Sequence, residues 1–391
     1  MATVSNSTTG PSRMHGFDDT DHVMMARALR LAERGAWTTK PNPMVGCVLL
    51  RDGDVVGEGW HQRAGGPHAE ILALQAAGER ARGATAYVTL EPCDHHGRTP
   101  PCSLALIEAG VARVVIATLD PNPRARGGAA RLRQAGVSVT SGVLEAAARA
   151  QNEAFLTNQL HGRPFVLYKT AMSLDGKVAL AAGPARWITG PAARALVHAW
   201  RDQHDAIAVG VGTVLADDPS LTTRREGGEG PGRTPIKVIF DGQARTPPGA
   251  RLFEAGPDGA PARVIVVVSE AAPEERVAAL RARGAEVLGV PGGRPDLRLA
   301  LEALLPRGVS SLLLEGGGTL AWGFLASALI DRVAWFVAPK LIGGAGTPGP
   351  LAGPGVARID DAVRLEDLTT QLVGDDLLVM GRPRYPGSDQ R

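Results

Sequence analysis

The sequence predicts an α/β protein of two domains. Its 391 residues exceed the length that one hydrophobic core usually serves, so two cores are expected. Apolar segments with helical spacing alternate with short β-branched segments, which is typical of helices that cover a largely buried sheet. A break at Gly162 and Pro164 separates two such series. We therefore expect a disordered tail at 1–17, a first domain at 18–162 and a second domain at 163–391.

The first domain is predicted from the order of its elements. The segment DHVMMARALRLAERG has an amphipathic helical pattern that ends on Gly35, and the segment 44–60 predicts two strands around a turn at Asp52 and Gly53. The next elements expected are a helix over 68–81, a strand over 84–91, a helix over 102–110, a strand over 112–120, another helix and a short strand over 137–142. One helix from Leu144 to the stop at Gly162 completes the domain.

The second domain is predicted as a further series of strands with helices between several of them. The strands are expected at 165–176, 205–214, 236–242, 262–269, 285–290, 310–318, 332–344 and 376–382. The glycine-rich segments 224–235 and 343–357 are expected to be loops.

Composition excludes several classes of function. With Lys+Arg 42 against Asp+Glu 40, the formal charge is only +2, so no nucleic acid or anionic membrane is expected as a partner. An anionic substrate must therefore be bound by a few well-placed arginines. Three cysteines are too few for a disulfide framework and are usual in a reducing cytoplasm. No apolar run approaches the roughly 20 residues of a membrane span, and the first residues lack the pattern of a signal peptide. We expect a cytoplasmic protein.

Three residues of the first domain form a set of candidate zinc ligands. Zinc prefers imidazole and thiolate, and a catalytic site uses three protein ligands so that a fourth position stays open for water. His68, Cys93 and Cys102 supply that number. Glu70, two residues after the histidine at the start of a helix, is placed to reach this water without being a ligand. The pattern therefore predicts a catalytic zinc site with Glu70 as its proton shuttle.

The motifs around these residues resemble a known family. H-x-E followed by two cysteines is a signature of zinc nucleobase deaminases, but that signature has two residues between the cysteines and this chain has eight. The string EPCDHHGRTPPC, with PNPMVGC and GEGWHQRAGGPHAE before it, resembles the deaminase domain of the bifunctional deaminase–reductases of riboflavin biosynthesis, which have the same cysteine spacing. The resemblance implies a cytidine-deaminase-like three-layer fold. It also implies substrate contacts from Asn42, His61, Ala69, His95 and Arg98.

Plainer interpretations of these residues are a closed structural zinc site or two core cysteines near a histidine. A structural site would require a fourth ligand and would leave Glu70 without a function. Cys47, within the apolar segment MVGCVLL, is expected to be a buried strand residue only.

The second domain contains a candidate nucleotide site. The strand SSLLLEGGG runs into the helix TLAWGFLASAL, which places a glycine turn at a helix N-terminus, where free amides can bind phosphate. Gly316, Gly318 and Ala321 fit the G-x-G-x-x-A fingerprint loosely, but the next strand does not end in the acidic residue that a dinucleotide-binding unit requires. Alone, this signal is weak.

Motifs in the rest of the second domain strengthen the prediction of a nucleotide site. KTAMSLDGK, RWITG, RDQHDAIAVGVGTVLADDPSLTTR, EGGGTL and KLIGG resemble the reductase domain of the same enzymes, which implies a dihydrofolate-reductase-like fold and NADPH as cofactor. The resemblance implies cofactor contacts from Ala171, Trp187, Thr213, Asp217, Gly316, Gly317 and Gly318, and substrate contacts from Arg201, Leu221, Arg224 and Glu315. Chemically, the two arginines can neutralise a phosphate dianion and Glu315 can accept hydrogen bonds from ribose hydroxyls.

Some positions stay open. Ala185 and Gly242 stand where the family usually has serines that help to hold the cofactor, so those contacts are in doubt. Lys169 and Asp175 are candidates for the general acid of the reduction only because they lie near its motif.

The function expected from the resemblance is zinc-dependent deamination of a phosphorylated pyrimidine ribosylamine, followed by NADPH-dependent reduction of its ribosyl group, in a homo-oligomer such as a dimer. A nucleic-acid-binding deaminase is an alternative, but the charge is near zero and aromatic residues make up 4% of the chain. Another alternative is a deaminase whose second half is vestigial. NADPH oxidation by the isolated second half would distinguish the bifunctional enzyme from this alternative.

Overall fold

The computed structural model describes residues 17–36, 38–96, 100–180, 187–224 and 232–387. The chain divides between Leu160 and His161 into two compact units, each with its own sheet. Of the predicted tail, residues 1–16 lie outside the described residues, and Phe17 packs against the apolar cluster that contains Met25. None of the described helices is both long and apolar enough to cross a membrane.

The first unit contains a sheet of five strands in the order β2-β1-β3-β4-β5. Its elements are α1 (Asp19–Glu33), β1 (Gly46–Arg51), β2 (Asp54–Trp60), α2 (Ala69–Ala77), β3 (Thr85–Leu90), α3 (Cys102–Glu108), β4 (Arg113–Thr118), α4 (Gly128–Gln134), β5 (Ser138–Ser141), α5 (Glu145–Gln151) and α6 (Glu153–His161). The strands β3, β4 and β5 are parallel, whereas β1 is antiparallel to both of its neighbours.

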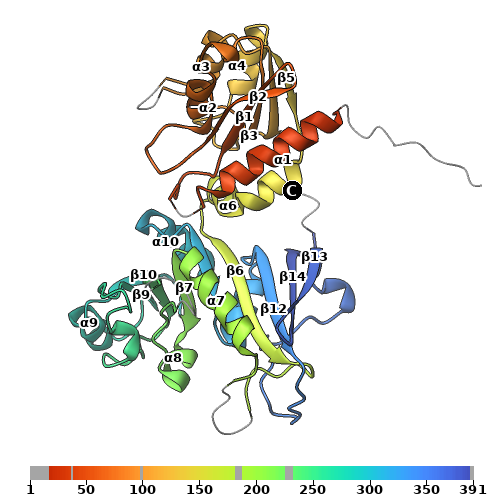
Figure 1. Cartoon of the computed structure of the whole chain (residues 1–391). Helices are drawn as coiled ribbons and strands as arrows, with labels where there is room; N and C mark the ends of the chain where they lie inside the picture. Colours follow the sequence, from red (N-terminus) through yellow and green to blue (C-terminus); the bar gives the residue numbers. More distant parts are fainter. Residues whose placement is uncertain (1–16, 37, 97–99, 181–186, 225–231, 388–391) are drawn as a thin grey trace, which may run out of the picture. The chain divides into compact units, whose positions relative to one another are not determined.

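Alternating side chains give this unit its three layers (Figure 1). Cys47 and Leu49 of β1 face α2, α3 and α4, while Val48 between them faces α1 and α5. Because successive strand residues point to opposite faces, both faces of the sheet are apolar and covered. The three-layer fold predicted for this unit is confirmed.

The single helix predicted from Leu144 to Gly162 is instead two helices, α5 and α6. Asn152 separates them, because its side chain hydrogen-bonds the main chain of Met44: Oδ1 accepts from the nitrogen at 2.8 Å and Nδ2 donates to the oxygen at 2.9 Å. A tertiary contact of this kind leaves no trace in the helical periodicity of the sequence.

The second unit contains a nine-stranded sheet in the order β10-β9-β8-β7-β11-β6-β12-β14-β13. Its elements are β6 (Phe165–Ser173), α7 (Pro191–Gln203), β7 (Ala206–Gly210), α8 (Val211–Asp217), β8 (Ile236–Phe240), β9 (Val264–Ser269), α9 (Glu274–Ala282), β10 (Glu286–Val290), α10 (Leu297–Leu304), β11 (Ser311–Leu314), α11 (Gly318–Ala326), β12 (Arg332–Ala338), β13 (Arg364–Val373) and β14 (Asp376–Arg384). From β10 to β12 the strands are parallel, and β14 and β13 continue the sheet antiparallel.

Two apolar clusters hold helices against this sheet. One cluster includes Phe324 of α11 and Leu301 of α10, and the other, on the opposite face, includes Val214 of α8 and Val277 of α9. The parallel strands with helices packed on both faces confirm the α/β class predicted for this unit.

Two expectations for this unit were wrong. The strand predicted over 205–214 ends at Gly210, where α8 begins, so Thr213 lies on a helix. The sequence interpretation also missed β13, an edge strand whose residues are almost all exposed. Strand prediction relies on a buried face, and β13 has none.

Candidate functional site

The geometry of the first site begins with a close approach between α2 and β2. A Cβ atom built at Gly59 would lie 2.3 Å from the main-chain oxygen of Ala69, so only glycine lets the helix lie this near the strand. His68 occupies the N-cap position of α2, and Glu70 is in its first turn. The start of α2 is thereby fixed against the sheet, with both side chains at one end of the helix.

His68, Cys93 and Cys102 bring one nitrogen and two sulfur atoms together. The His68 Nδ1 atom lies 3.5 Å from Cys93 Sγ and 3.3 Å from Cys102 Sγ, and all three ligand atoms lie within 4.8 Å of one another. In a tetrahedral zinc site with Zn–S of about 2.3 Å and Zn–N of about 2.0 Å, such ligand atoms lie roughly 3.5 Å apart. The residues therefore fit zinc without rearrangement.

The two cysteines and their neighbours are held together by hydrogen bonds. The Cys102 nitrogen donates to Cys93 Sγ at 3.4 Å, and the Ser103 nitrogen donates to the Cys93 oxygen at 3.2 Å. The Ser103 hydroxyl also donates to Asp94 Oδ1 at 2.6 Å. Hydrogen bonds from Cys102 and His68 lower the pKa of Cys93 despite its burial, which favours the thiolate that binds metal.

Glu70 is buried beside the three ligands, with only 3% of its surface exposed. Burial raises the pKa of its carboxyl to about 7. A carboxyl group in this environment can exist in both protonation states near neutral pH, which suits a group that takes up and releases protons.

A pocket of about 260 Å³ opens onto this cluster. The residues that line it are Asn42, Pro43, Val45, His61, His68, Glu70, Leu90, Glu91, Cys93, His95, Asp120, Asn122, Ala125 and Phe155. Four of the predicted residues other than the metal ligands, Asn42, His61, Glu70 and His95, therefore share one cavity. Ala69 is fully buried on α2, so its methyl group faces the core, and Arg98 lies outside the described residues.

His61 orients the amide of Asn42. The His61 Nδ1 atom lies 3.0 Å from the Pro67 oxygen, and Nε2 lies 3.2 Å from Asn42 Nδ2. Because a main-chain oxygen can only accept, Nδ1 carries the proton and Nε2 accepts from the amide. Burial lowers the pKa of His61, which favours this neutral ring. The Asn42 carbonyl oxygen is consequently the end of the amide that can meet a donor on a ligand.

The second site forms where three neighbouring parallel strands end. Since β11 lies between β7 and β6, Thr213 after β7, Glu315 after β11 and Ala171 near the end of β6 come from adjacent positions in the sheet. Ligands of open α/β sheets bind at this edge. The order of the strands thus brings together residues that are far apart in the sequence.

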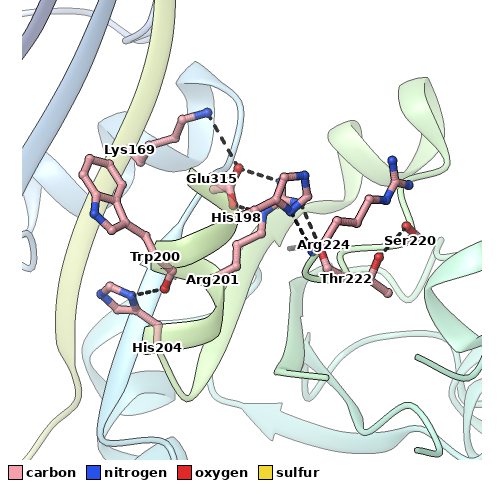
Figure 2. Close-up of polar contacts among 9 residues, drawn as sticks. All are labelled: Lys169, His198, Trp200, Arg201, His204, Ser220, Thr222, Arg224 and Glu315. Atoms are coloured by element: carbon pink, nitrogen blue, oxygen red, sulfur yellow. Dashed lines mark hydrogen bonds and ion pairs between the residues drawn. The ribbon is translucent and has the colours of Figure 1, made fainter. Parts of the chain in front are cut away.

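Glu315 is surrounded by cationic groups (Figure 2). Arg201 binds it through two parallel hydrogen bonds, Nε to Oε1 at 2.6 Å and Nη2 to Oε2 at 2.9 Å, and Lys169 Nζ lies 3.8 Å from Oε2. Burial opposes the charge, but Arg201 first and Lys169 next outweigh it and lower the pKa of Glu315 to about 2. Glu315 is therefore a carboxylate at every physiological pH.

The two predicted phosphate-binding arginines differ in their surroundings. Arg201 makes a third hydrogen bond, in which Nη1 donates to the Thr222 oxygen at 3.1 Å. Three of the five N–H groups of its guanidinium are therefore occupied within the protein. Arg224 is exposed. Leu221 is 4% exposed and packs in the core at a φ of 50°, so its main chain alone faces the site.

The glycine turn fits the phosphates of a nucleotide. Gly317 is the N-cap of α11, and no side chain caps the helix there. A Cβ atom at Gly317 would lie 3.8 Å from Thr213 Oγ1, so the hydroxyl of this predicted cofactor residue is next to the turn. A Cβ atom at Gly318 would lie 2.8 Å from the nitrogen of Ala352, so a side chain would be crowded there. Main-chain amides at the positive end of a helix can receive a diphosphate here.

The other predicted cofactor residues lie on elements around this edge. Trp187 is 61% exposed, and the Arg194 guanidinium lies 4.8 Å from the centre of its ring. Asp217 is the last residue of α8. At Gly242 a Cβ atom would lie 2.9 Å from Pro295 Cδ, so a serine side chain would be crowded there. Ala185 lies outside the described residues.

Comparison with known proteins identifies the family. The model of the RibD C-terminal domain matches residues 164–379, and that of the cytidine and deoxycytidylate deaminase zinc-binding region matches residues 18–118. The riboflavin biosynthesis protein RibD of Actinobacillus pleuropneumoniae is 44% identical over 363 residues, which cover 92% of this chain and 94% of that protein. The chain belongs to the RibD family.

Solved structures of RibD proteins agree with this fold. RibD of Acinetobacter baumannii, form 1, is 38% identical with a TM-score of 0.79, and the match covers 93% of this chain and 99% of that one. The Thermotoga maritima protein, described as a diaminohydroxyphosphoribosylaminopyrimidine deaminase/5-amino-6-(5-phosphoribosylamino)uracil reductase, is 37% identical with a TM-score of 0.76 and the same coverage. As a RibD protein, the chain is a bifunctional deaminase and reductase of riboflavin biosynthesis.

Two acidic residues of the deaminase pocket were missed in the sequence of this RibD protein. Asp120 follows β4, and burial raises the pKa of its carboxyl to about 6. Glu91 follows β3 and accepts from the nitrogens of Gly127 and Ala129 at 3.1 and 3.0 Å. No local motif marks either residue, because they reach the pocket through the parallel pairing of β3 with β4.

Proposed function

We propose that the two units catalyse consecutive steps on one phosphorylated pyrimidine. The first unit would deaminate 2,5-diamino-6-ribosylamino-pyrimidinone 5'-phosphate, and the second would reduce the ribosyl group of the product with NADPH. The observation that carries this proposal is the His68, Cys93 and Cys102 cluster with Glu70 buried beside it. This cluster lies in a chain whose first unit matches the cytidine and deoxycytidylate deaminase zinc-binding region and whose second unit matches the RibD C-terminal domain. The description of the Thermotoga maritima relative supports the choice of substrates.

Zinc bound by these three residues supplies a Lewis acid that lowers the pKa of coordinated water. Because Glu70 is not a ligand, its carboxylate is free to transfer protons. It accepts a proton from the attacking water and delivers it to the amine that leaves as ammonia. Its burial excludes bulk water, which would otherwise compete for the same proton. His68, Cys93 and Cys102 would hold the zinc beside the buried Glu70 carboxyl.

Recognition of the pyrimidinone ring is assigned to acceptors of the pocket. Asn42, oriented by His61, directs its carbonyl oxygen to ring N–H groups. Asp120 also lines the pocket, and its Oδ1 accepts from the Asn122 nitrogen at 2.8 Å, which fixes the carboxyl group. Acceptors in these positions suit a substrate rich in N–H donors and reject ring analogues that lack them.

In the second unit, NADPH held at the glycine turn of Gly316 to Gly318 would supply the hydride for C1 of the ribosyl group. The ring opens to the ribitylamino chain, and its oxygen takes up a proton. Lys169 is the better candidate for the proton donor, because burial lowers its pKa and Glu315 holds its ammonium group. Asp175 is not suited to this role. Hydrogen bonds from Ser173 and from the nitrogens of Gly343 and Ile342 lower its pKa to about 2.

The proposal is tested by assay of both steps with purified protein. The wild type should release ammonia from the diamino substrate without NADPH, and should oxidise NADPH only with the deaminated product.

Gly317→Asp should raise the KM for NADPH at least about tenfold, roughly 1.4 kcal/mol, because its carboxylate repels the cofactor diphosphate. Asp is a favoured N-cap, so α11 should stay intact. Gly317→Ala, which adds a methyl group in ordinary contact, should lose much less. An unchanged KM in Gly317→Asp would refute the cofactor site.

The chain is also proposed to form the homo-oligomer expected from the family resemblance. The exposed edge strand β13 and its neighbour β14 present Leu365, Leu368, Leu372 and Leu377, which are 39%, 57%, 75% and 37% exposed. A second copy would cover these leucines. Sedimentation should therefore give a dimer that Leu372→Glu weakens, and a wild-type monomer at micromolar concentration would contradict the proposal.

A further inference from the structure

His198 lies in the reductase site but has no role among the residues assigned so far. It is a partly buried residue of α7, three positions before Arg201, so both side chains leave the same face of the helix. Figure 2 shows its ring between Glu315 and the segment that carries Arg224.

The ring of His198 holds the main chain of Arg224. The Arg224 nitrogen donates to His198 Nδ1 at 3.2 Å. A ring nitrogen that accepts must carry a lone pair, so the ring proton of neutral His198 is on Nε2. The imidazole is thus an acceptor toward Arg224, and its other nitrogen is a donor.

The segment from Thr222 to Arg224 is attached to α7 at alternate residues. The Thr222 oxygen accepts from Arg201 Nη1 at 3.1 Å, and the Arg224 nitrogen donates to His198. Thr223 between them is fully buried, and its hydroxyl donates to the Arg233 oxygen at 2.6 Å. In an extended segment, the main-chain groups of alternate residues point to the same side. Thr222 and Arg224 therefore both face α7, where Arg201 and His198 bind them.

We propose that His198 is a positioning residue of the reductase site, which places the Arg224 guanidinium for the substrate phosphate by holding its main chain against α7. The inference rests on the proposed function, because it assumes that Arg224 meets a phosphate. Arg201 is already committed to Glu315 and Thr222, so the exposed Arg224 is the arginine whose placement matters most for that phosphate. His198 therefore acts through Arg224 and does not touch the substrate itself.

The test compares His198→Leu with His198→Gln. Leucine fills the space but cannot accept a hydrogen bond, whereas the glutamine amide can both accept and donate. His198→Leu should raise the KM for the phosphorylated, deaminated substrate about tenfold, while kcat stays within about twofold. The dephosphorylated substrate should show no more than about a twofold change. His198→Gln should lie within about threefold of the wild type, and the kcat of reduction by each variant reports the folding of the second unit.

A double-mutant cycle with Arg224→Met identifies the route of the effect. In the Arg224→Met protein, His198→Leu should raise the KM less than about twofold further, because the group it positions is gone. The full tenfold effect in that background would overturn the inference, as would an equal loss on both substrates or no loss in His198→Leu. Affinities for the two substrates, measured by calorimetry without NADPH, give the same comparison. If the wild type binds but does not reduce, the proposed function fails while these affinities still decide the role of His198.

Discussion

Replacing Glu70 with Gln is expected to lower deamination at least about 100-fold while zinc stays bound. Gln has nearly the same shape but cannot accept and return a proton, and the loss of a positioned general base typically costs this factor or more. Glu70 is not one of the three candidate zinc ligands, so metal analysis should still find about one zinc per chain. Cys93→Ser, which removes a ligand, should lose the zinc as well as the activity.

The control is Glu79→Gln, the same change at an exposed position just after α2. It should deaminate like the wild type. Near-normal turnover in Glu70→Gln would refute the proton shuttle. Retention of zinc by Cys93→Ser and also by Cys102→Ser would refute the ligand assignment.

Lys169→Met is expected to lower NADPH-dependent reduction at least about 100-fold, because the proton donor next to Glu315 is lost. The rate of reduction is measured with the deaminated substrate at saturating NADPH. Deamination by the same protein should be unchanged, and an unchanged affinity for NADPH, measured by calorimetry, shows that the second unit is folded.

Lys169→Arg separates the charge of Lys169 from its proton. Arginine keeps a cation beside Glu315 but does not deprotonate in proteins, so it cannot act as the acid. This variant should therefore also be slow in reduction. Reduction by Lys169→Arg at a rate near that of the wild type would show that only the positive charge is needed.

The zinc site could be predicted from the sequence because its parts are local. His68 and Glu70 begin one helix, and Cys93 and Cys102 are nine positions apart in the chain, so short motifs contain the chemistry. Asp120 could not be recognised in this way. It meets the site only because β3 and β4 are parallel neighbours, which brings the residues after both strands to one edge.

The reductase site shows the same limit more strongly. The sequence interpretation assigned Arg201 and Glu315 to different parts of the substrate, but the two side chains are paired with each other across 114 positions of the chain. His198 had no motif at all, and its position is visible only when α7 lies beside the segment that ends at Arg224. Long-range pairing of polar side chains is set by topology and packing, which local patterns do not report.

The most direct measurement mixes Glu70→Gln protein with Lys169→Met protein, because the central claim is that one chain carries two separate sites. Each site draws its described residues from one unit, so each variant should lack one reaction and retain the other. With the diamino substrate and NADPH, the mixture should form the reduced product after a lag, and the lag should shorten as Glu70→Gln protein is added. If each variant is folded but lacks both reactions, and the mixture forms no reduced product, the account of two separate sites is wrong.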